Sequence, residues 1–191
     1  NTPMLSSFPL LALSSLLAAS SLAQPQEPPV DNENYRAGIG LLNKGLDEAA
    51  ATELRAYLKA HPDGPDAPSA HYALAVCLWK LHQPADAGKE LDAILPLKTF
   101  EFAADARLLR ARCAEAAGDD RAVLAALDTL AADHPSFDKL DQAALSLAEA
   151  QYRLARYKDC RQTLTAALAA FPKSPSLPRA TLFLAMAESA Q

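Results

Sequence analysis

The sequence has few β-branched aliphatic residues, since Val and Ile together number five among 191 residues. Sheets depend on branched side chains to cover their pleated faces, so this scarcity excludes an all-β protein and a doubly wound α/β fold. Basic residues are in the minority, with 18 Lys and Arg against 23 Asp and Glu and a net charge of −5. Because nucleic-acid affinity comes mainly from Lys and Arg on phosphates, we expect no nucleic-acid partner.

Enzyme motifs are missing as well. The sequence contains no glycine-rich phosphate loop, nucleophile elbow, HExxH motif or paired CxxC motif. Two of the four histidines, His61 and His134, each precede a proline, which indicates a structural role at a helix end. The other two, His71 and His82, are eleven residues apart, about 16 Å along a helix, too far to share a metal. We therefore expect no enzyme activity, no metal, no cofactor and no small-molecule substrate.

No Lys or Arg occurs before Arg36, and the N-terminal segment is apolar. Residues 5–23 read LSSFPLLALSSLLAASSLA and end in small residues that suit signal-peptide cleavage. Because the basic start of a signal peptide is absent, a retained membrane anchor and an ordinary buried helix stay open as alternatives. The sequence predicts a signal peptide over 1–23, a Pro-rich linker over 24–34, and an exported protein of the periplasm or cell envelope.

Alanine and leucine dominate the rest of the chain and recur with a period of 36 or 37 residues. Four columns share this period: Gly38, Ala75, Ala111, Ala148 and Ala185; Ala50, Ala87, Val123 and Cys160; Leu54, Leu91, Leu127 and Leu164; and Pro62, Thr99, Pro135 and Pro172. Each period holds two segments with apolar residues at helical spacing, as at Leu124, Leu127 and Leu130. A tight turn that includes Gly45 or Gly118 joins the two segments, and a proline follows the second. The pattern predicts a series of helix pairs.

This pattern resembles the tetratricopeptide repeat (TPR), in which small residues and a terminal proline recur in a helix–turn–helix unit. The resemblance implies an all-α fold over 35–191, a TPR-like right-handed solenoid of antiparallel helix pairs. It comprises four pairs and a fifth first helix, which we expect to be truncated. The proline-punctuated loops are similar to those of Gram-negative envelope TPR proteins, including Tol–Pal-associated and outer-membrane-assembly components. Two departures stand out: the period exceeds thirty-four residues, and the early aromatic position holds Asn34, His71, Arg107 and Ala144.

The three cysteines stand in columns otherwise held by small residues. Cys77 and Cys113 replace Gly40, Ala150 and Ala187, and Cys160 replaces Ala50 and Ala87. Neighbouring first helices are expected about 8–10 Å apart, which exceeds the Cα separation that a disulfide tolerates. We expect buried free thiols.

The resemblance also implies a concave groove lined by one face of each first helix. The residues that it places there are Tyr35, Ile39 and Leu42; Tyr72, Val76, Trp79 and Lys80; Leu108, Arg112 and Glu115; and Leu145, Glu149, Tyr152 and Arg153. We expect partner binding at Tyr35, Tyr72, Val76, Trp79, Lys80, Arg112, Glu149, Tyr152 and Arg153, with an apolar anchor at Trp79 and a carboxylate near Arg153. The competing interpretation is that these side chains only pack against adjacent helices, which we prefer for Leu42, Leu108 and Leu145.

The predicted function is a protein-interaction scaffold of the bacterial envelope that binds a protein or peptide segment in the groove. The alternative is a structural N-terminal repeat region of a larger protein, whose function, enzymatic or not, lies beyond residue 191. The last helix also carries Leu182, Phe183, Leu184 and Met186 around most of its circumference. We therefore expect an uncovered apolar strip there, and self-association through it.

Overall fold

The chain folds into helices that follow the predicted repeat. The computed structural model describes residues 32–97 and 100–190, and these residues form ten helices and no strand. The helices are α1 (Glu33–Asn43), α2 (Asp47–Ala60), α3 (Ala67–Lys80), α4 (Pro84–Ile94), α5 (Ala103–Ala117), α6 (Asp120–Leu127), α7 (Leu130–Asp133), α8 (Leu140–Arg153), α9 (Tyr157–Ala170) and α10 (Leu177–Ser189). All belong to one compact unit, Asp31–Gln191.

Some sequence predictions fall on residues that are not described. The predicted signal peptide over 1–23, most of the linker and Thr99 of the proline column lie outside the described ranges. The linker was expected to reach residue 34, but α1 already begins at Glu33. None of the helices in 32–97 and 100–190 is both long and apolar enough to cross a membrane.

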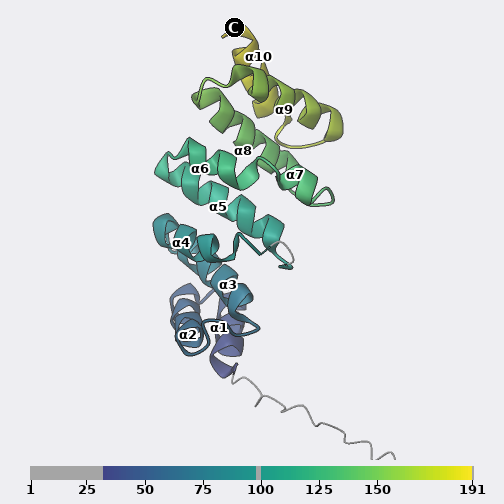
Figure 1. Ribbon diagram of the computed structural model, residues 1–191. Helices are drawn as coiled ribbons and strands as arrows, with labels where there is room; N and C mark the ends of the chain where they lie inside the picture. The colour runs from purple at the N-terminus through teal and green to yellow at the C-terminus, as the bar shows by residue number, and fades with distance from the viewer. Residues whose placement is uncertain (1–31, 98–99, 191) are drawn as a thin grey trace, which may run out of the picture. The chain divides into compact units, whose positions relative to one another are not determined.

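The helices pack in the order that a repeat of helix pairs requires. Each pair consists of adjacent helices in contact: α1 with α2, α3 with α4, α5 with α6, and α8 with α9. The second helix of each pair also contacts the first helix of the next, as α2 does with α3 and α9 with α10. Figure 1 shows this succession from α1 to α10 in chain order. In the described residues these contacts form four successive pairs followed by α10, and the second helix of the third pair is divided into α6 and α7.

The turn inside each pair has the same backbone conformation in all four pairs. Gly45, His82, Gly118 and Ala155 have φ values of 73°, 59°, 70° and 57°, and they are again 37, 36 and 37 residues apart. The N–H of the residue after each donates to a carbonyl five residues back, from Leu46 to Leu41 and from Arg156 to Gln151, for example. This is the Schellman motif, which satisfies carbonyls at a helix end and favours glycine. Only two of the four positions carry the glycine that the motif favours.

The small and leucine columns form the interior. Leu54, Leu91 and Leu164 are fully buried, and Leu127 is 2% exposed. Gly38 has no room for a side chain, because an added Cβ would lie 2.7 Å from Leu54 Cγ. Ala185 departs from its column and is exposed. This column faces the second helix of its own pair, and no helix follows α10 in the described residues.

The cysteine prediction is confirmed. Cys77, Cys113 and Cys160 are free and buried. Burial raises the pKa of the Cys77 and Cys113 thiols to about 11 and also raises that of Cys160. These thiols therefore stay protonated at neutral pH and act as small packing groups.

The second helix of the third pair is divided, whereas the sequence predicted one helix through Leu124, Leu127 and Leu130. Arg107 of α5 donates from Nε to the carbonyl of Ala126 at 2.8 Å. Its two Nη atoms donate to Thr129 Oγ1 and Asp133 Oδ2, each at 2.7 Å. In a continuous helix the Ala126 carbonyl would accept from the N–H of Leu130. The Arg107 guanidinium competes for that bond at the boundary between α6 and α7.

Candidate peptide-binding groove

A hollow of about 260 Å³ lies between α3, α5 and α8. Six residues that the sequence assigned to the groove line it together: Tyr72, Val76, Trp79, Lys80, Leu108 and Arg112. The other lining residues are Asp105, Leu109, Lys139 and Gln142. Spacing along α3 explains the first four, since residues 72, 76, 79 and 80 fall on one helical face. The apolar interior of the hollow comes from Val76, Trp79 and Leu108.

Aromatic rings from the loop before α5 support one wall of the hollow. The Tyr72 ring stacks on Phe102, with centroids 5.2 Å apart and planes 7° apart. Phe100 meets the edge of both rings. Burial, and secondarily the nearby carboxylate of Asp105, raises the pKa of Tyr72 to about 12. Sequence reasoning missed Phe100 and Phe102 because they lie in a loop, where helical spacing gives no signal.

The lining carries an excess of positive charge. Lys139 Nζ pairs with Asp105 at 2.6 Å, and Lys80 Nζ pairs with Asp47 at 3.1 Å. Arg112 differs from both lysines, because its Nη2 donates to the neutral side-chain amide of Gln142 at 2.8 Å. A neutral acceptor leaves the guanidinium charge uncompensated by that contact. Arg112 is therefore the cation in the lining best placed to receive an acidic group.

Four of the predicted binding residues lie outside this hollow. Tyr35 packs on the ring of Tyr57, with centroids 5.4 Å apart. Tyr152 packs between Tyr157 and Phe183, at 5.4 and 5.6 Å. For Tyr35 and Tyr152, the contacts match the packing alternative.

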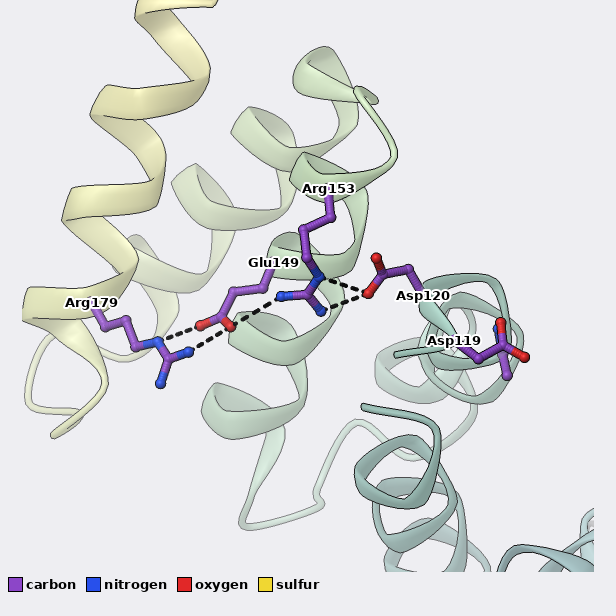
Figure 2. Close-up of polar contacts among 6 residues, drawn as sticks. Asp119, Asp120, Glu149, Arg153 and Arg179 are labelled. Carbon is purple, nitrogen blue, oxygen red and sulfur yellow. Dashed lines mark hydrogen bonds and ion pairs between the residues drawn. The ribbon is translucent and has the colours of Figure 1, made fainter. Parts of the chain in front are cut away.

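The remaining two, Glu149 and Arg153, belong to a charge network that links three helices (Figure 2). Arg153 Nη2 pairs with Asp120 Oδ1 at 2.7 Å and approaches Glu149 through Nη1 at 3.7 Å. Glu149, which is 6% exposed, also binds Arg179 of α10 at 2.5 Å. The hydrogen bond that Arg153 donates to Asp120 raises the pKa of the Arg153 guanidinium above its ordinary value. A partner carboxylate was expected near Arg153, but carboxylates of this chain already hold that guanidinium.

Asp120 has its counterpart two repeats earlier. Asp47 and Asp120 each stand in the first turn of a second helix. The cations that they bind, Lys80 and Arg153, end the first helix of the following pair. Asp119, beside Asp120 in Figure 2, caps α6 instead and accepts from the N–H of Ala122 at 3.0 Å. These ion pairs tie consecutive helix pairs together.

Histidines and acidic residues do not gather into a metal site in the described ranges. No group of three or more His, Cys, Asp or Glu side chains there is placed to hold a metal ion. His71 Nδ1 lies 2.7 Å from Glu90 Oε2, a contact between the two helices of the second pair. This contact gives His71 a structural partner.

Comparison with known proteins agrees with the helical fold. Residues 35–101 match the tetratricopeptide repeat family, whereas no curated protein matches the chain. A crystal structure of the MamA protein superposes with a TM-score of 0.68 at 16% identity, covering 82% of this chain and 80% of that one. The nearly identical TPR-like repeats of a candidate kinesin light chain from Podosopora anserina give 0.62 at 15% identity, covering 82% and 84%. The described helices, the match over 35–101 and these similarities together show that the chain has an all-α, TPR-like fold.

Proposed function

We propose that this chain is a protein-interaction scaffold that binds a peptide segment in the hollow between α3, α5 and α8. The observation that carries the proposal is the meeting of Trp79, Val76 and Leu108 with the guanidinium of Arg112 in one hollow. Binding interfaces gain most of their affinity from such aromatic and arginine anchors. TPR repeats generally serve protein–protein interaction, which supports the same class of function.

The lining also indicates what the segment carries. An apolar side chain would bury its surface on Trp79 and Val76. An Asp or Glu close to it would meet Arg112, whose contact with Gln142 is neutral. The pairing of Lys139 with Asp105 restricts that end of the hollow, because a second carboxylate there would face Asp105. We therefore propose a segment with one acidic residue beside a bulky apolar one.

Selection from a random twelve-residue peptide library displayed on phage tests this specificity. We expect the enriched sequences to pair an acidic residue with an aromatic or aliphatic one. Arg112→Gln should remove the preference for the acidic residue while retaining the apolar one. Arg121→Gln is the matched control, because Arg121 is exposed on α6 and does not line the hollow. Enrichment without acidic residues, or an unchanged preference in Arg112→Gln, would refute the role of Arg112.

We further propose that the chain acts after export, in the periplasm or cell envelope. The support is the apolar segment 5–23 and the small residues before Gln24. Expression in a Gram-negative host should then give a periplasmic product that begins at Gln24. N-terminal sequencing of a membrane-bound product that retains Met4 would contradict this proposal.

A further inference from the structure

A second and larger hollow, of about 710 Å³, lies between α6, α7, α8 and α9. Its floor is a stripe on α8 made of Leu140, Ala143, Ala144, Leu147 and Gln151. None of these residues lines the groove that holds Trp79. The hollow is therefore separate from the peptide site, and a different face of α8 forms it.

The repeat explains why this hollow exists. Ala144 occupies the position that His71 and Arg107 occupy in the two preceding pairs. Those side chains reach the second helix of their own pair, His71 to Glu90 at 2.7 Å and Arg107 to the Ala126 carbonyl at 2.8 Å. Thr163 of α9 corresponds to Glu90 and Ala126 in the repeat, and the Ala144 side chain is too short to reach it. The space that a long polar side chain occupies in the second and third pairs is open in the fourth.

The neighbouring position on α8 repeats this difference. Leu147 corresponds to Arg110, which fills the equivalent place in the third pair and pairs with Asp92 at 2.6 Å. The α9 side of the hollow is lined by the short side chains of Ala166, Ala167 and Ala170. Ala144 and Leu147 thus stand where the third pair has Arg107 and Arg110.

One buried polar side chain faces this apolar space. Gln151 is 4% exposed and lines the hollow. Its Oε1 accepts a hydrogen bond from Thr163 Oγ1 at 3.0 Å, while its Nε2 has no hydrogen-bond partner among the described residues. Turning the amide over exchanges the two atoms, so one end lacks a partner in either orientation. The buried side-chain atoms without a hydrogen-bond partner in the described residues do not include this amide. Its free end is therefore open to the hollow, where it can bind one complementary polar group of a ligand.

Shape restricts the occupant. The floor from Leu140 to Gln151 spans eleven residues, or roughly 16 Å along a helix. Along the middle of α8, at Ala143 and Leu147, the backbone groups bond one another within the helix and offer no partner to the amides of an extended peptide. The volume lies within the range of about 300–1,000 Å³ that is usual for small-molecule sites.

The charges in the lining disfavour an anion. Arg156 pairs with Asp159 at 2.8 Å, and Asp128 adds a second carboxylate. We propose that this hollow binds a neutral, largely apolar small molecule with a single hydrogen-bonding group directed at Gln151. Such a molecule would be bound without reaction, as a ligand and not as a substrate. It also stands independently of peptide binding.

The test is a fluorescence titration with N-phenyl-1-naphthylamine, a neutral naphthalene probe with one N–H group. We expect saturable binding with one site per chain. The anionic probe 8-anilinonaphthalene-1-sulfonate has the same ring systems plus a sulfonate, and we expect it to bind at least tenfold more weakly. Tighter binding of the sulfonate would overturn the assignment to a neutral ligand.

Variants locate the probe. Ala144→Arg restores the residue type that fills the equivalent space at Arg107, and Ala166→Trp adds a bulky ring from an exposed position on the wall. Each should weaken probe binding at least tenfold. Ala169→Arg is the matched control on α9, exposed and outside the lining, and it should bind like the original chain. If Ala144→Arg fails to fold, probe binding by Ala166→Trp alone tests the location of the site.

Probe binding that is absent, does not saturate, or is equal in Ala166→Trp and Ala169→Arg would overturn the proposal. Trp79→Ala should leave the titration unchanged, because Trp79 lines the other hollow. Loss of probe binding in Trp79→Ala would show that the probe occupies the peptide groove instead, which would also overturn it.

Discussion

Replacing Ala155 with glycine should stabilise the protein, although the change removes a methyl group. Ala155 has a φ of 57° in the turn between α8 and α9. A left-handed backbone costs an L-residue roughly 1–2 kcal/mol, and glycine avoids that cost. Glycine also has more freedom to lose on folding, which offsets part of the gain. We expect a net stabilisation of about 1 kcal/mol.

The reverse substitution at the equivalent turn gives an independent estimate of the same quantity. Gly118 has a φ of 70°, and a Cβ added there would have nothing within 4 Å. Gly118→Ala should therefore destabilise the protein by about 1 kcal/mol through conformation alone, without a steric clash. Ala56→Gly, at an exposed position inside α2, is the control for sign, because glycine inside a helix costs about 1 kcal/mol.

Urea denaturation followed by circular dichroism measures these effects. The midpoint should rise for Ala155→Gly and fall for Gly118→Ala and Ala56→Gly, at an unchanged slope. Because repeat arrays can unfold in segments, amide hydrogen exchange at the α8–α9 turn should be measured beside the denaturation midpoint. A midpoint that falls in Ala155→Gly would refute the argument that this turn is strained.

Two further predictions concern packing. The thiols of Cys77, Cys113 and Cys160 should react slowly with a thiol reagent in the folded protein and count three after denaturation. Burial raises the pKa of Cys77 and Cys113 to about 11, so their contribution to the free energy of unfolding is present below the ordinary thiol pKa. This contribution should be lost as the pH rises toward 11. Rapid labelling of the folded protein at pH 8 would contradict the slow reaction expected of buried thiols. On α10, Leu182 is 58% exposed, whereas Phe183 packs against Tyr152, so the open strip carries Leu182 and not Phe183. Leu182→Lys should reduce self-association in sedimentation at high concentration without loss of stability. Phe183→Lys should lower the thermal midpoint. A lowered midpoint in Leu182→Lys, together with reduced self-association and an unchanged midpoint in Phe183→Lys, would refute this orientation of α10.

The repeat could be predicted from the sequence because its determinants recur at fixed spacing. Leu54 and Leu91 occupy the same place in successive helix pairs, so one period fixes many contacts at once. The turn position was also visible at Gly45 and Gly118. His82 and Ala155 gave no such signal on their own, and their left-handed conformation follows from the register of the repeat.

The features that the sequence did not predict depend on one long side chain meeting a distant partner. Arg153 matched a groove position, but its pairing with Asp120 spans 33 residues. Arg107 divides α6 from α7 through contacts 19 to 26 residues away. The sequence offered one clue to the second hollow, since Ala144 stands where His71 and Arg107 stand in other repeats. The hollow could not be predicted from Ala144 alone, because the sequence does not show which space His71 and Arg107 fill in the other repeats.

The most direct test of peptide binding uses the tryptophan of this chain. Trp79 is the only tryptophan in the sequence, and it lines the hollow between α3, α5 and α8. A peptide selected by the display experiment should change its emission saturably, with the same dissociation constant as calorimetry gives. Truncation of a central aromatic anchor typically costs 2 kcal/mol or more, so Trp79→Ala should weaken binding by roughly thirtyfold or more in calorimetry. Peptide binding that leaves the emission of Trp79 unchanged and survives Trp79→Ala would contradict the proposed groove.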